Sequence, residues 1–464
     1  MKYHFVGVGG SGMSAIAQVL IGQGHAVSGS DRSFDRNLTP HIFNKLKAQG
    51  ISLFPQDGSG VTPETDFVIV STAIEESNPD IHAARKFNIP IKKRAEELAE
   101  IVNERRGVAI GGSSGKTTTT AMTAWLLETA GLDPTVINGG FIKNYISNTL
   151  LGNAKAGGGE FVCVEADESD GSIVNYTPEI AVITNISKDH KTVDELIELF
   201  RTFANNTTGT LILNADCPVL RSAGIEHRRI VTFGTSADAN IRASDIALRE
   251  DGSEFVADGA AFRLKLPGAY NISNALGAIA VGKVLGLSNT VIAEGLETFL
   301  GVSRRMDFVG EARGIKVIDD FAHNPAKIEA ALKTLQPHFD RIIAVYQPHG
   351  FGPTKFLRNE LVEAFSATLR NRDVLHMLKI YYAGGTADMS ISSEELVEEI
   401  KQRGKKAVYH TDREELADII AAEAQAGDVV IVMGARDNTL PGFCAKILER
   451  ISRTSGGTAP ERQG

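Results

Sequence analysis

Short apolar runs rich in β-branched residues recur along the 464-residue chain, and they constrain its fold more than any other feature. They include YHFVGV, DFVIVST, GVAIGG, FVCVEAD, IAVITNI, RIIAVY and DVVIVMG. Their apolar residues occupy consecutive positions, as in parallel strands that are buried on both faces, and helix-like stretches separate them. The pattern predicts an α/β protein built from strand–helix–strand units throughout.

The chain divides into three sections by its local signals. We expect a glycine-rich first domain over residues 1–105, a phosphate-binding domain over 106–302 and a third α/β domain over 303–452. Three domains suit the length, because domains commonly contain about 150 residues. Residues 453–464 are polar and rich in glycine and proline, which predicts a flexible tail.

Composition excludes several classes of function. The net charge of -9 and the pI near 5.7 argue against general binding to nucleic acid or to an anionic membrane. The three cysteines, Cys163, Cys217 and Cys444, lack the spacing of a disulfide framework or a zinc site. The sequence contains neither a signal peptide nor an apolar stretch of about 18 residues, so we expect a cytoplasmic protein.

The segment GGSSGKTTTT, residues 111–120, lies between an apolar strand and a helix-like run. At such a turn backbone N–H groups and the helix N-terminus face an anion, the lysine reaches the β- and γ-phosphates, and the following hydroxyl can ligate Mg²⁺. Ile110 occupies the place of the first glycine of a full P-loop, which leaves the shorter motif Gly112, Ser113, Ser114, Gly115, Lys116 and Thr117. The alternative is a glycine–serine turn with a solvated lysine, and in either case we expect Lys116 to be exposed.

A second glycine-rich turn opens the chain. Gly7, Gly9, Gly10 and Gly12 follow the first strand, and Asp31 ends the next one, close to a dinucleotide-binding fingerprint. Such glycines let the backbone approach a diphosphate, and the carboxylate could accept from a ribose hydroxyl. The turn therefore fits NAD or a UDP-sugar, and glycines needed only for packing are the alternative.

Two polar clusters follow apolar strands in the middle section. Glu165–Asp170 carries four acidic residues, and Asn185–His190 ends in an Asp-His pair. Ligands of open α/β sheets collect at the carboxyl ends of strands, and Mg²⁺ prefers a few hard oxygen ligands. Thr117 with one carboxylate of the acidic cluster is therefore a candidate Mg²⁺ site, although acidic runs are often only solvated surface.

The chain resembles the Mur ligases, most closely the members that join L-alanine to UDP-N-acetylmuramate. The resemblance spans nearly the whole chain, in blocks that follow the order of the family: HFVGVGGSGMS, STAIEESNP, GSSGKTTTT, EADESD, TNISKDH, PGAYNISNALGAIAV, GVSRRMDFVGE, VIDDFAHNP, QPHG and GDVVIVMGA. It implies a Rossmann-like N-terminal domain that binds UDP-sugar through Gly9, Gly10, Ser11, Gly12 and Asp31. A central P-loop ATPase domain and a Rossmann-like C-terminal domain would follow.

The resemblance also implies ATP-dependent amide formation with ATP and Mg²⁺. Lys116 would hold the ATP phosphates, Thr117 and Glu165 would bind Mg²⁺, and His190 would bind a second Mg²⁺.

The resemblance implies further residues that contact the adenine, the ATP phosphates and the amine. Asn271 and Asn274 would face the adenine. Arg305 and Asp320 would complete the ATP site, and His323 and His349 would line the pocket where the phosphate and the amine meet.

Several residues depart from the family pattern. Histidine is usual where Ser114, Tyr270 and Asn324 stand, and Met-Asp where Lys191 and Thr192 stand. Two arginines of the block after Gln347 are replaced by Gly350 and Pro353, which cannot pair with a substrate carboxylate. The amine acceptor is therefore open, with Lys355 or Arg358 as possible replacements.

We consider three functions. The first is a ligase of UDP-N-acetylmuramate and an amino acid, acting as a monomer or homodimer without nucleic-acid or membrane partners. The second is a Mur-like amide ligase with another acid or amine, and the third is a nucleotide-binding relative without ligase activity. An NAD oxidoreductase ranks lower, because two of the three sections would then have no purpose.

Overall fold

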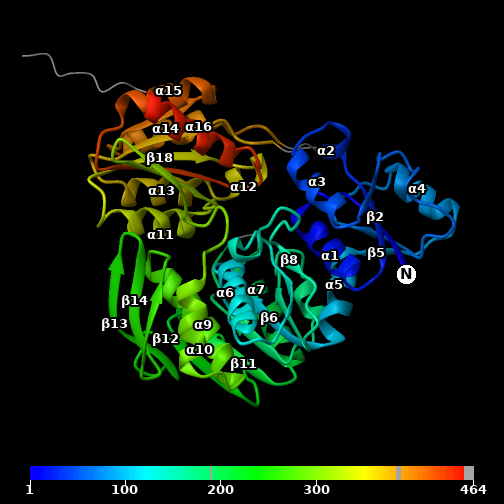
Figure 1. Cartoon of the computed structure of the whole chain (residues 1–464). Coiled ribbons are helices and arrows are strands. Elements are labelled where there is room, and N and C mark those ends of the chain that lie inside the picture. The colour runs from blue at the N-terminus through cyan, green and yellow to red at the C-terminus, as the bar shows by residue number, and fades with distance from the viewer. Residues whose placement is uncertain (189–190, 383–387, 454–464) are drawn as a thin grey trace, which may run out of the picture. The chain divides into compact units, whose positions relative to one another are not determined.

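The computed structural model describes residues 1–188, 191–382 and 388–453 (Figure 1). The chain forms two compact units, one over Met1–Ser303 and one from Arg304 on. The predicted tail lies, apart from Arg453, outside the described residues. Within the described ranges, every helix is too short or too polar to cross a membrane.

The first unit begins with a parallel five-stranded sheet of order β3-β2-β1-β4-β5. The order reverses between β1 and β4, and ligands of doubly wound sheets bind at such a switch point. The glycine turn lies there, between β1 and α1. The elements are β1 (Lys2–Val6), α1 (Ser11–Gly22), β2 (Ala26–Ser30), α2 (Arg32–Asp35), α3 (Pro40–Ala48), β3 (Ser52–Phe54), β4 (Phe67–Val70), α4 (Pro79–Lys86), β5 (Ile91–Lys93) and α5 (Arg94–Asn103).

A ten-stranded sheet of order β15-β14-β13-β12-β11-β10-β6-β9-β7-β8 follows. The parallel strands β9 and β10 flank β6, so the segments after these three strands meet at one edge. Its first elements are β6 (Arg106–Gly111), α6 (Lys116–Thr129), β7 (Thr135–Ile137), η1 (Lys143–Tyr145), β8 (Ala154–Lys155), β9 (Phe161–Glu165), η2 (Ser172–Asn175), β10 (Ile180–Ile183) and α7 (Val193–Asn206). The rest are β11 (Thr210–Asn214), α8 (Pro218–Ser222), β12 (Ile230–Gly234), β13 (Ile241–Arg249), β14 (Gly252–Ala257), β15 (Ala260–Leu264), α9 (Ala269–Val284) and α10 (Asn289–Thr298).

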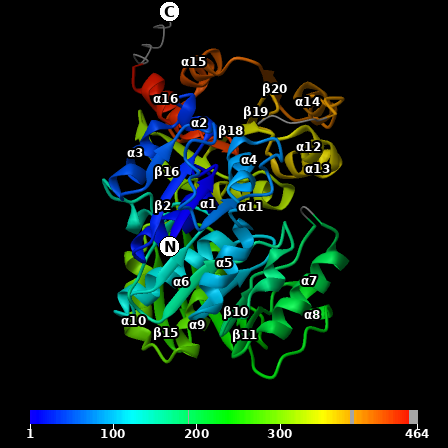
Figure 2. The ribbon, with the colours of Figure 1, turned by 90° about the vertical axis from the view of Figure 1, so that its right-hand side faces the viewer.

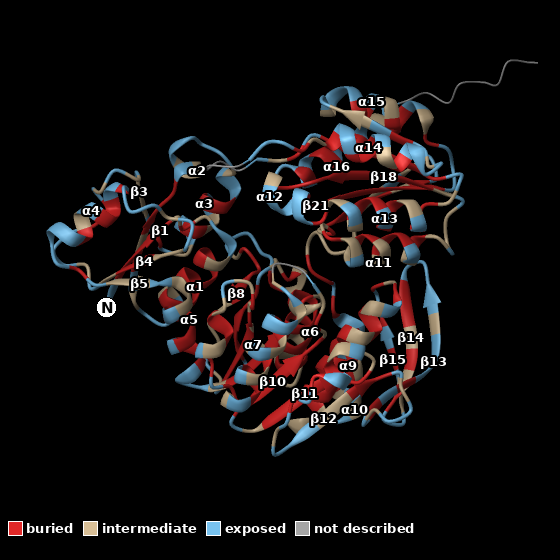
Figure 3. Ribbon diagram, turned by 180° about the vertical axis from the view of Figure 1, so that it is seen from behind, coloured by how far each residue is buried: buried red, intermediate tan, exposed pale blue. Residues whose placement is uncertain are grey.

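Apolar residues that alternate along the central strands pack on both faces of this sheet. Val108 and Ile110 of β6 pack in one core with α6 and α9, while Ala109 packs in another with Phe200 and Phe203 of α7. Helices accordingly lie on either side of β10 and β11, and the central strands are buried along their length (Figures 2 and 3). Burial on both faces explains why these strands are apolar at consecutive positions.

The prediction of strand–helix–strand units throughout is wrong for part of the sheet. Strands β13, β14 and β15 form an antiparallel meander without intervening helices. Much of β13 is exposed, and its sequence IRASDIALR mixes polar and apolar residues as a half-solvated antiparallel strand does.

The second unit contains a six-stranded sheet of order β16-β17-β21-β18-β19-β20, in which only β16 is antiparallel. The last strand, β21, lies between β17 and β18 and is fully buried. The elements are β16 (Asp307–Ala312), β17 (Ile315–Asp320), α11 (Pro325–Leu335), β18 (Arg341–Gln347), α12 (Phe351–Phe356), α13 (Arg358–Thr368), β19 (Val374–Leu378), α14 (Ser393–Gln402), β20 (Ala407–His410), α15 (Arg413–Glu423), β21 (Asp428–Gly434) and α16 (Leu440–Arg453).

Candidate active site

The predicted phosphate loop connects β6 to α6 and depends on two glycines. Gly112 and Gly115 have φ angles of +130° and +86°, which side-chain-bearing residues rarely adopt. A Cβ atom at Gly112 would lie 2.1 Å from Thr184 Oγ1, and one at Gly115 would lie 2.4 Å from Asn274 Oδ1. The loop therefore packs closely against the end of β10 and against α9.

Residues after β10 hold the loop through hydrogen bonds. The Ser114 N–H donates to Asn185 Oδ1 at 3.0 Å, and Asn185 Nδ2 donates to the Ser114 carbonyl at 2.9 Å. Thr184 Oγ1 donates to the same carbonyl at 2.6 Å, and Ser113 Oγ donates to the Ser187 carbonyl at 2.9 Å. Part of the second polar cluster thus shapes the phosphate loop, a role that the sequence analysis missed.

Lys116 is largely buried, with 13 % of its side chain exposed, so the expectation of an exposed lysine is wrong. Its Nζ lies 2.7 Å from the Gly112 carbonyl and 2.7 Å from Glu168 Oε2. Burial lowers the pKa of Lys116, but the carboxylates of Glu168, Glu165 and Asp167 outweigh it and raise the pKa above its usual value. The lysine is therefore a fixed cation at the loop.

Thr117 and Glu165, the predicted Mg²⁺ ligands, lie together. Thr117 Oγ1 donates to Glu165 Oε1 at 3.0 Å, and the Gly139 N–H donates to Glu165 Oε2 at 2.8 Å. A hydroxyl and a carboxylate beside a phosphate loop are a donor set that suits Mg²⁺. His190, predicted to bind a second ion, lies outside the described residues.

Asn271 and Asn274 are buried on the first turns of α9. Asn274 Nδ2 donates to Asn271 Oδ1 at 3.2 Å, and Thr119 Oγ1 donates to Asn274 Oδ1 at 3.3 Å. The structure thus places Asn274 against α6 and beside Gly115, so it helps to fix the loop. A contact with adenine stays a prediction.

The glycine turn after β1 is held by Asp31. The Gly9 N–H donates to Asp31 Oδ2 at 2.9 Å, and the Ser33 N–H donates to Asp31 Oδ1 at 2.7 Å, so both oxygens already accept from the backbone. Arg94 lies against Gly12, where a Cβ atom would be 3.0 Å from its Nη1, and Arg94 Nη2 lies 3.1 Å from Asp170 Oδ2. Arg94 therefore connects the glycine turn to the acidic segment.

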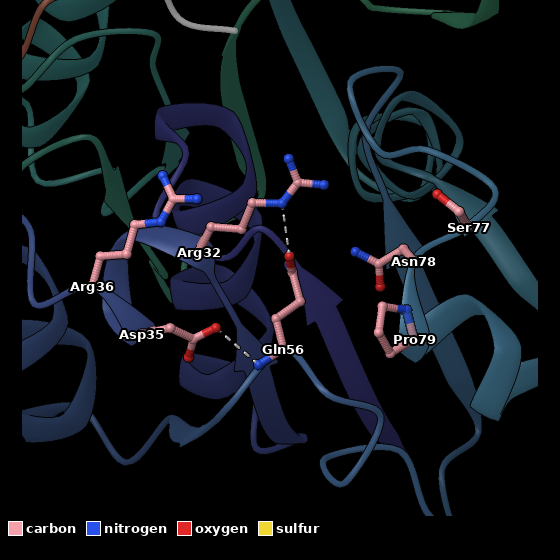
Figure 4. A pocket seen from close by; sticks show the side chains of 7 residues that line it. All are labelled: Arg32, Asp35, Arg36, Gln56, Ser77, Asn78 and Pro79. Carbon is pink, nitrogen blue, oxygen red and sulfur yellow. Dashed lines mark hydrogen bonds between the residues drawn. The ribbon is translucent and has the colours of Figure 1, made fainter. Parts of the chain in front are cut away.

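A cavity of about 290 Å³ lies in the same part of the chain, and Arg32, the residue after Asp31, lines it (Figure 4). Its lining includes the first residues of α2 and α4, namely Arg32, Asp35, Arg36, Gln56, Ser77, Asn78 and Pro79. Arg32 Nε donates to Gln56 Oε1 at 3.2 Å. Asn78 is 3 % exposed, and its Nδ2 has no hydrogen-bond partner in the described ranges. This buried amide is left to be satisfied by a water molecule or a ligand in the cavity, and the sequence analysis did not identify it.

In the second unit, Asp320 ends β17 and binds the backbone. Its Oδ2 accepts from the Met306 N–H at 2.6 Å, and its Oδ1 accepts from the Ala322 N–H at 2.7 Å. Burial raises the pKa of Asp320, and Arg305 is among the groups that oppose this rise. The Arg305 guanidinium lies 4.6 Å from the centroid of the Phe321 ring. The turn that carries Arg305 is thus fixed by the carboxylate of Asp320.

His323 and His349 follow β17 and β18, and their ring centroids are 5.1 Å apart. His323 Nδ1 lies 2.9 Å from the Phe321 carbonyl. Burial, followed by the charges of neighbouring groups, lowers the pKa of His323 well below its usual value. The structure thus places the two histidines side by side, with His323 neutral near pH 7. That they line the substrate pocket stays a prediction.

The two cations proposed to replace the missing arginines are engaged elsewhere. Lys355 Nζ lies 2.7 Å from Asp388 Oδ2, and Arg358 pairs with Glu399. Both belong to ion pairs with carboxylates, and the Lys355 pair is largely exposed, so it costs little to break. Their role in place of the missing arginines stays a prediction.

Family models match three successive stretches of the chain. Residues 2–106 match "Mur ligase family, catalytic domain", residues 110–282 match "Mur ligase middle domain", and residues 304–436 match "Mur ligase, glutamate ligase domain". The predicted domain boundaries themselves stay predictions.

Individual relatives agree with these matches. The chain is 39 % identical to the UDP-N-acetylmuramate--L-alanine ligase of Rhizobium meliloti (strain 1021), over 98 % of each chain. The structure of UDP-N-acetylmuramate-alanine ligase from Thermotoga maritima has a TM-score of 0.80 and 28 % identity, covering 98 % of this chain and 100 % of that one. A MurF ligase from Thermotoga maritima in complex with ADP shares the fold at 19 % identity and a TM-score of 0.58, covering 84 % of this chain and 88 % of that one. The chain belongs to the Mur ligase family.

Proposed function

We propose that the protein joins L-alanine to UDP-N-acetylmuramate in an ATP-dependent reaction of peptidoglycan synthesis. The observation that carries this proposal is the phosphate loop, with Lys116 fixed beside Thr117 and Glu165, in a chain similar to L-alanine ligases over 98 % of its length. In the reaction, the muramate carboxylate attacks the γ-phosphate of ATP and ADP leaves. The amine of L-alanine then attacks the acyl phosphate, and phosphate leaves as the amide forms.

The first unit would carry the phosphoryl transfer. The N–H groups of Gly112–Gly115 and the N-terminus of α6 bind the phosphates, and Lys116 neutralises charge that develops on them. Thr117 and Glu165 hold Mg²⁺, which when bound neutralises the phosphate oxygens and orients them. His190 as the ligand of a second Mg²⁺ is carried over from the family motif alone.

The second unit would carry the attack by the amine. An amino acid arrives as an ammonium ion and must lose a proton before it can attack. Burial lowers the pKa of His323 and so keeps its imidazole neutral. A neutral ring can accept a hydrogen bond from the amine and orient it, but the same shift makes the ring a weaker base, so the proton of the ammonium ion goes to solvent. His349, next to it, would help to orient the amine, while Arg305, beside Asp320, would supply positive charge to the phosphate.

The UDP-sugar would bind at the glycine turn and the neighbouring cavity. The turn Gly9–Gly12 and the N-terminus of α1 suit a diphosphate. Arg32 and Asn78, in the cavity, offer hydrogen bonds to the polar nucleoside. Asp31, which already accepts from two N–H groups, supports the turn, and a contact with ribose would be additional. We expect the reaction to take place in the cytoplasm, with a monomer or homodimer as the active form.

The proposal is tested by incubating the protein with ATP, Mg²⁺, UDP-N-acetylmuramate and a panel of amino acids. We expect phosphate release that depends on all components, and a product whose mass corresponds to L-alanine addition. Phosphate release with a different acid or amine would instead support another amide ligase. Absence of turnover with every pair would support a nucleotide-binding relative.

The ligand of the glycine turn has its own test. Calorimetric titration should show binding of UDP-N-acetylmuramate and none of NADH. Binding of NADH without a response to UDP compounds would contradict the assignment of the first domain.

A further inference from the structure

The proposed reaction leaves one charged group of the substrate unassigned. L-Alanine reacts through its amine but also carries a carboxylate, and a buried carboxylate needs a cation. The segment after β18 offers none at Gly350 or Pro353. Lys355 and Arg358 are paired with the carboxylates of Asp388 and Glu399. Lys327 and Arg305 lie near enough to His323 to lower its pKa, and both have partners within the protein. The remaining candidates are the cations at the neighbouring strand ends.

Arg436 lies two residues beyond the end of β21. Strand β21 pairs in parallel with β17 on one side and with β18 on the other, so its carboxyl end lies between the ends of those strands. In register, Met433 pairs with Asp320 and Gly434 pairs with Gln347. His323 and His349 follow these partners. Arg436 therefore extends from the same sheet edge as the histidine pair.

The backbone of Arg436 is in a left-handed conformation, with φ +61°. Such a conformation costs about 1 kcal/mol or more for a residue with a side chain. The residues on either side are fixed. The Gly434 carbonyl accepts from Arg304 Nη2 at 2.7 Å, and the Asp437 carboxylate accepts from the Thr439 N–H at 2.9 Å and pairs with Arg413. The fold thus forces this conformation on an arginine, where glycine would be easier.

The side chain of Arg436 is exposed, and the described part of the chain gives its guanidinium no hydrogen-bond or ion-pair partner. No hydrogen bond or ion pair of the Arg436 side chain within the described residues therefore offsets the free energy of the strained backbone. Residues held in strained conformations at a site are typically ligand contacts. We propose that Arg436 binds the carboxylate of the incoming amino acid and so determines specificity for amino acids over simple amines.

Lys379, after β19, is the other exposed cation of this edge for which the described ranges give no side-chain partner. It is less suited. Its strand lies beyond β18 and is separated from β17 by two strands, whereas β21 touches both histidine-bearing strands. A guanidinium also binds a carboxylate through two parallel hydrogen bonds, which an ammonium cannot do.

The inference rests on the proposed function and is tested by Arg436→Gly in the full-length protein. We expect the KM for L-alanine to rise about ten- to a hundredfold, while the KM values for ATP and UDP-N-acetylmuramate change little. The preference for L-alanine over L-alaninamide, which lacks the carboxylate, should collapse. Arg436→Lys should restore part of both. Because glycine relieves the strain, the Tm of Arg436→Gly should rise or stay equal.

Arg313 provides a matched control. It is also an exposed arginine with a left-handed backbone, φ +55°, in the same unit, but it lies in the β16–β17 turn at the opposite edge of the sheet. Arg313→Gly should have the same effect on Tm and none on L-alanine use.

The outcomes separate the two proposals. A wild-type protein that joins no amino acid to UDP-N-acetylmuramate contradicts the proposed function itself. An active wild-type protein whose KM for L-alanine is the same in Arg436→Gly overturns the role of Arg436. A rise in this KM for Lys379→Ala alone would also overturn it and assign the contact to Lys379.

Discussion

Lys116 is both a candidate catalytic residue and a structural one. Lys116→Met should reduce ATP-dependent turnover at least a hundredfold, because the phosphates lose their fixed cation. It should also cost about 1–3 kcal/mol of unfolding free energy, since Glu168 would remain buried without its partner. The measurements are phosphate release and urea unfolding.

A second variant separates these two effects. Lys116→Met combined with Glu168→Gln should recover most of the stability and none of the turnover. Lys155→Met, which removes a more exposed lysine from its ion pairs with Glu128 and Asp133, should retain turnover. Substantial activity in the Lys116 variant would exclude this loop from the mechanism.

At the residue scale, the sequence predicts the type of chemistry better than it predicts which residues each side chain contacts. The phosphate motif is recognisable from a local pattern, whereas His323 and His349 are predicted only through the resemblance to the family. The choice of Glu168 as the partner of Lys116 is not predictable, because the segment from Glu165 to Asp170 contains four acids and only the packed fold selects one. Asp31 and Asp320 were predicted as contacts of substrates, and both are already held by backbone N–H groups. Such contacts depend on turn geometry, which residue type does not specify.

At the scale of elements, the phosphate loop packs closely against α9, at the contact between Gly115 and Asn274. Gly115→Ala should weaken ATP binding at least tenfold, because its Cβ atom would displace Asn274 and the loop that packs on it. Gly131→Ala is the control: it lies just after α6 with a similar φ of +73° but has no atom within 4 Å of its ideal Cβ. It should cost only backbone strain, about 1 kcal/mol. Equal ATP dissociation constants for the two variants would contradict the steric explanation.

Strands β19 and β20 are joined by a histidine pair that predicts a pH dependence. His376 Nδ1 lies 2.9 Å from His410 Nε2, and His376 Nε2 lies 2.8 Å from Glu423 Oε1. Burial and then the charge of His376 lower the pKa of His410 to about 4, with Glu423 opposing this shift. A lowered folded-state pKa contributes stability above the unfolded pKa of about 6.5 and loses it as pH falls through 4.

Unfolding free energy should therefore decrease between pH 6.5 and pH 4, by about 1 kcal/mol after allowance for solvent screening at this half-buried site. His410→Asn should remove that part of the slope. The check is urea unfolding across this range together with NMR titration of His410. A titration midpoint near 6.5, or parallel profiles for the two proteins, would contradict it.

Whether a strand can be predicted from the sequence depends on whether one or both of its faces are buried. Strands β6, β10 and β21 are buried on both faces and appear as continuous apolar runs, so they were found. Strands β13 and β16 were missed, because part of each faces solvent and its polar residues break the run. The order of the strands in the sheet could not be predicted either. Nothing in the sequence DVVIVMG of β21 indicates that this strand lies between β17 and β18.

At the scale of the whole molecule, the two units should unfold separately. ADP with Mg²⁺ at about one hundred times its dissociation constant should stabilise the unit with the phosphate loop by about 2.7 kcal/mol, because ligand binds only the folded state. In calorimetry, the transition of Met1–Ser303 should move to higher temperature and the other should not. Lys116→Met should abolish the shift. A single transition that moves as a whole would show that the units unfold together.

The position of β21 also has a consequence for synthesis of the chain. Among the described strands it comes last in the chain, yet it lies between β17 and β18. The strands that precede His323 and His349 therefore emerge without their common neighbour, while the N-terminal unit can already fold. A polypeptide that terminates before Asp428 would contain a complete phosphate loop but expose two unpaired strand edges, which favour aggregation and degradation. We therefore expect a chain truncated before Asp428 to be recovered as insoluble or digested material.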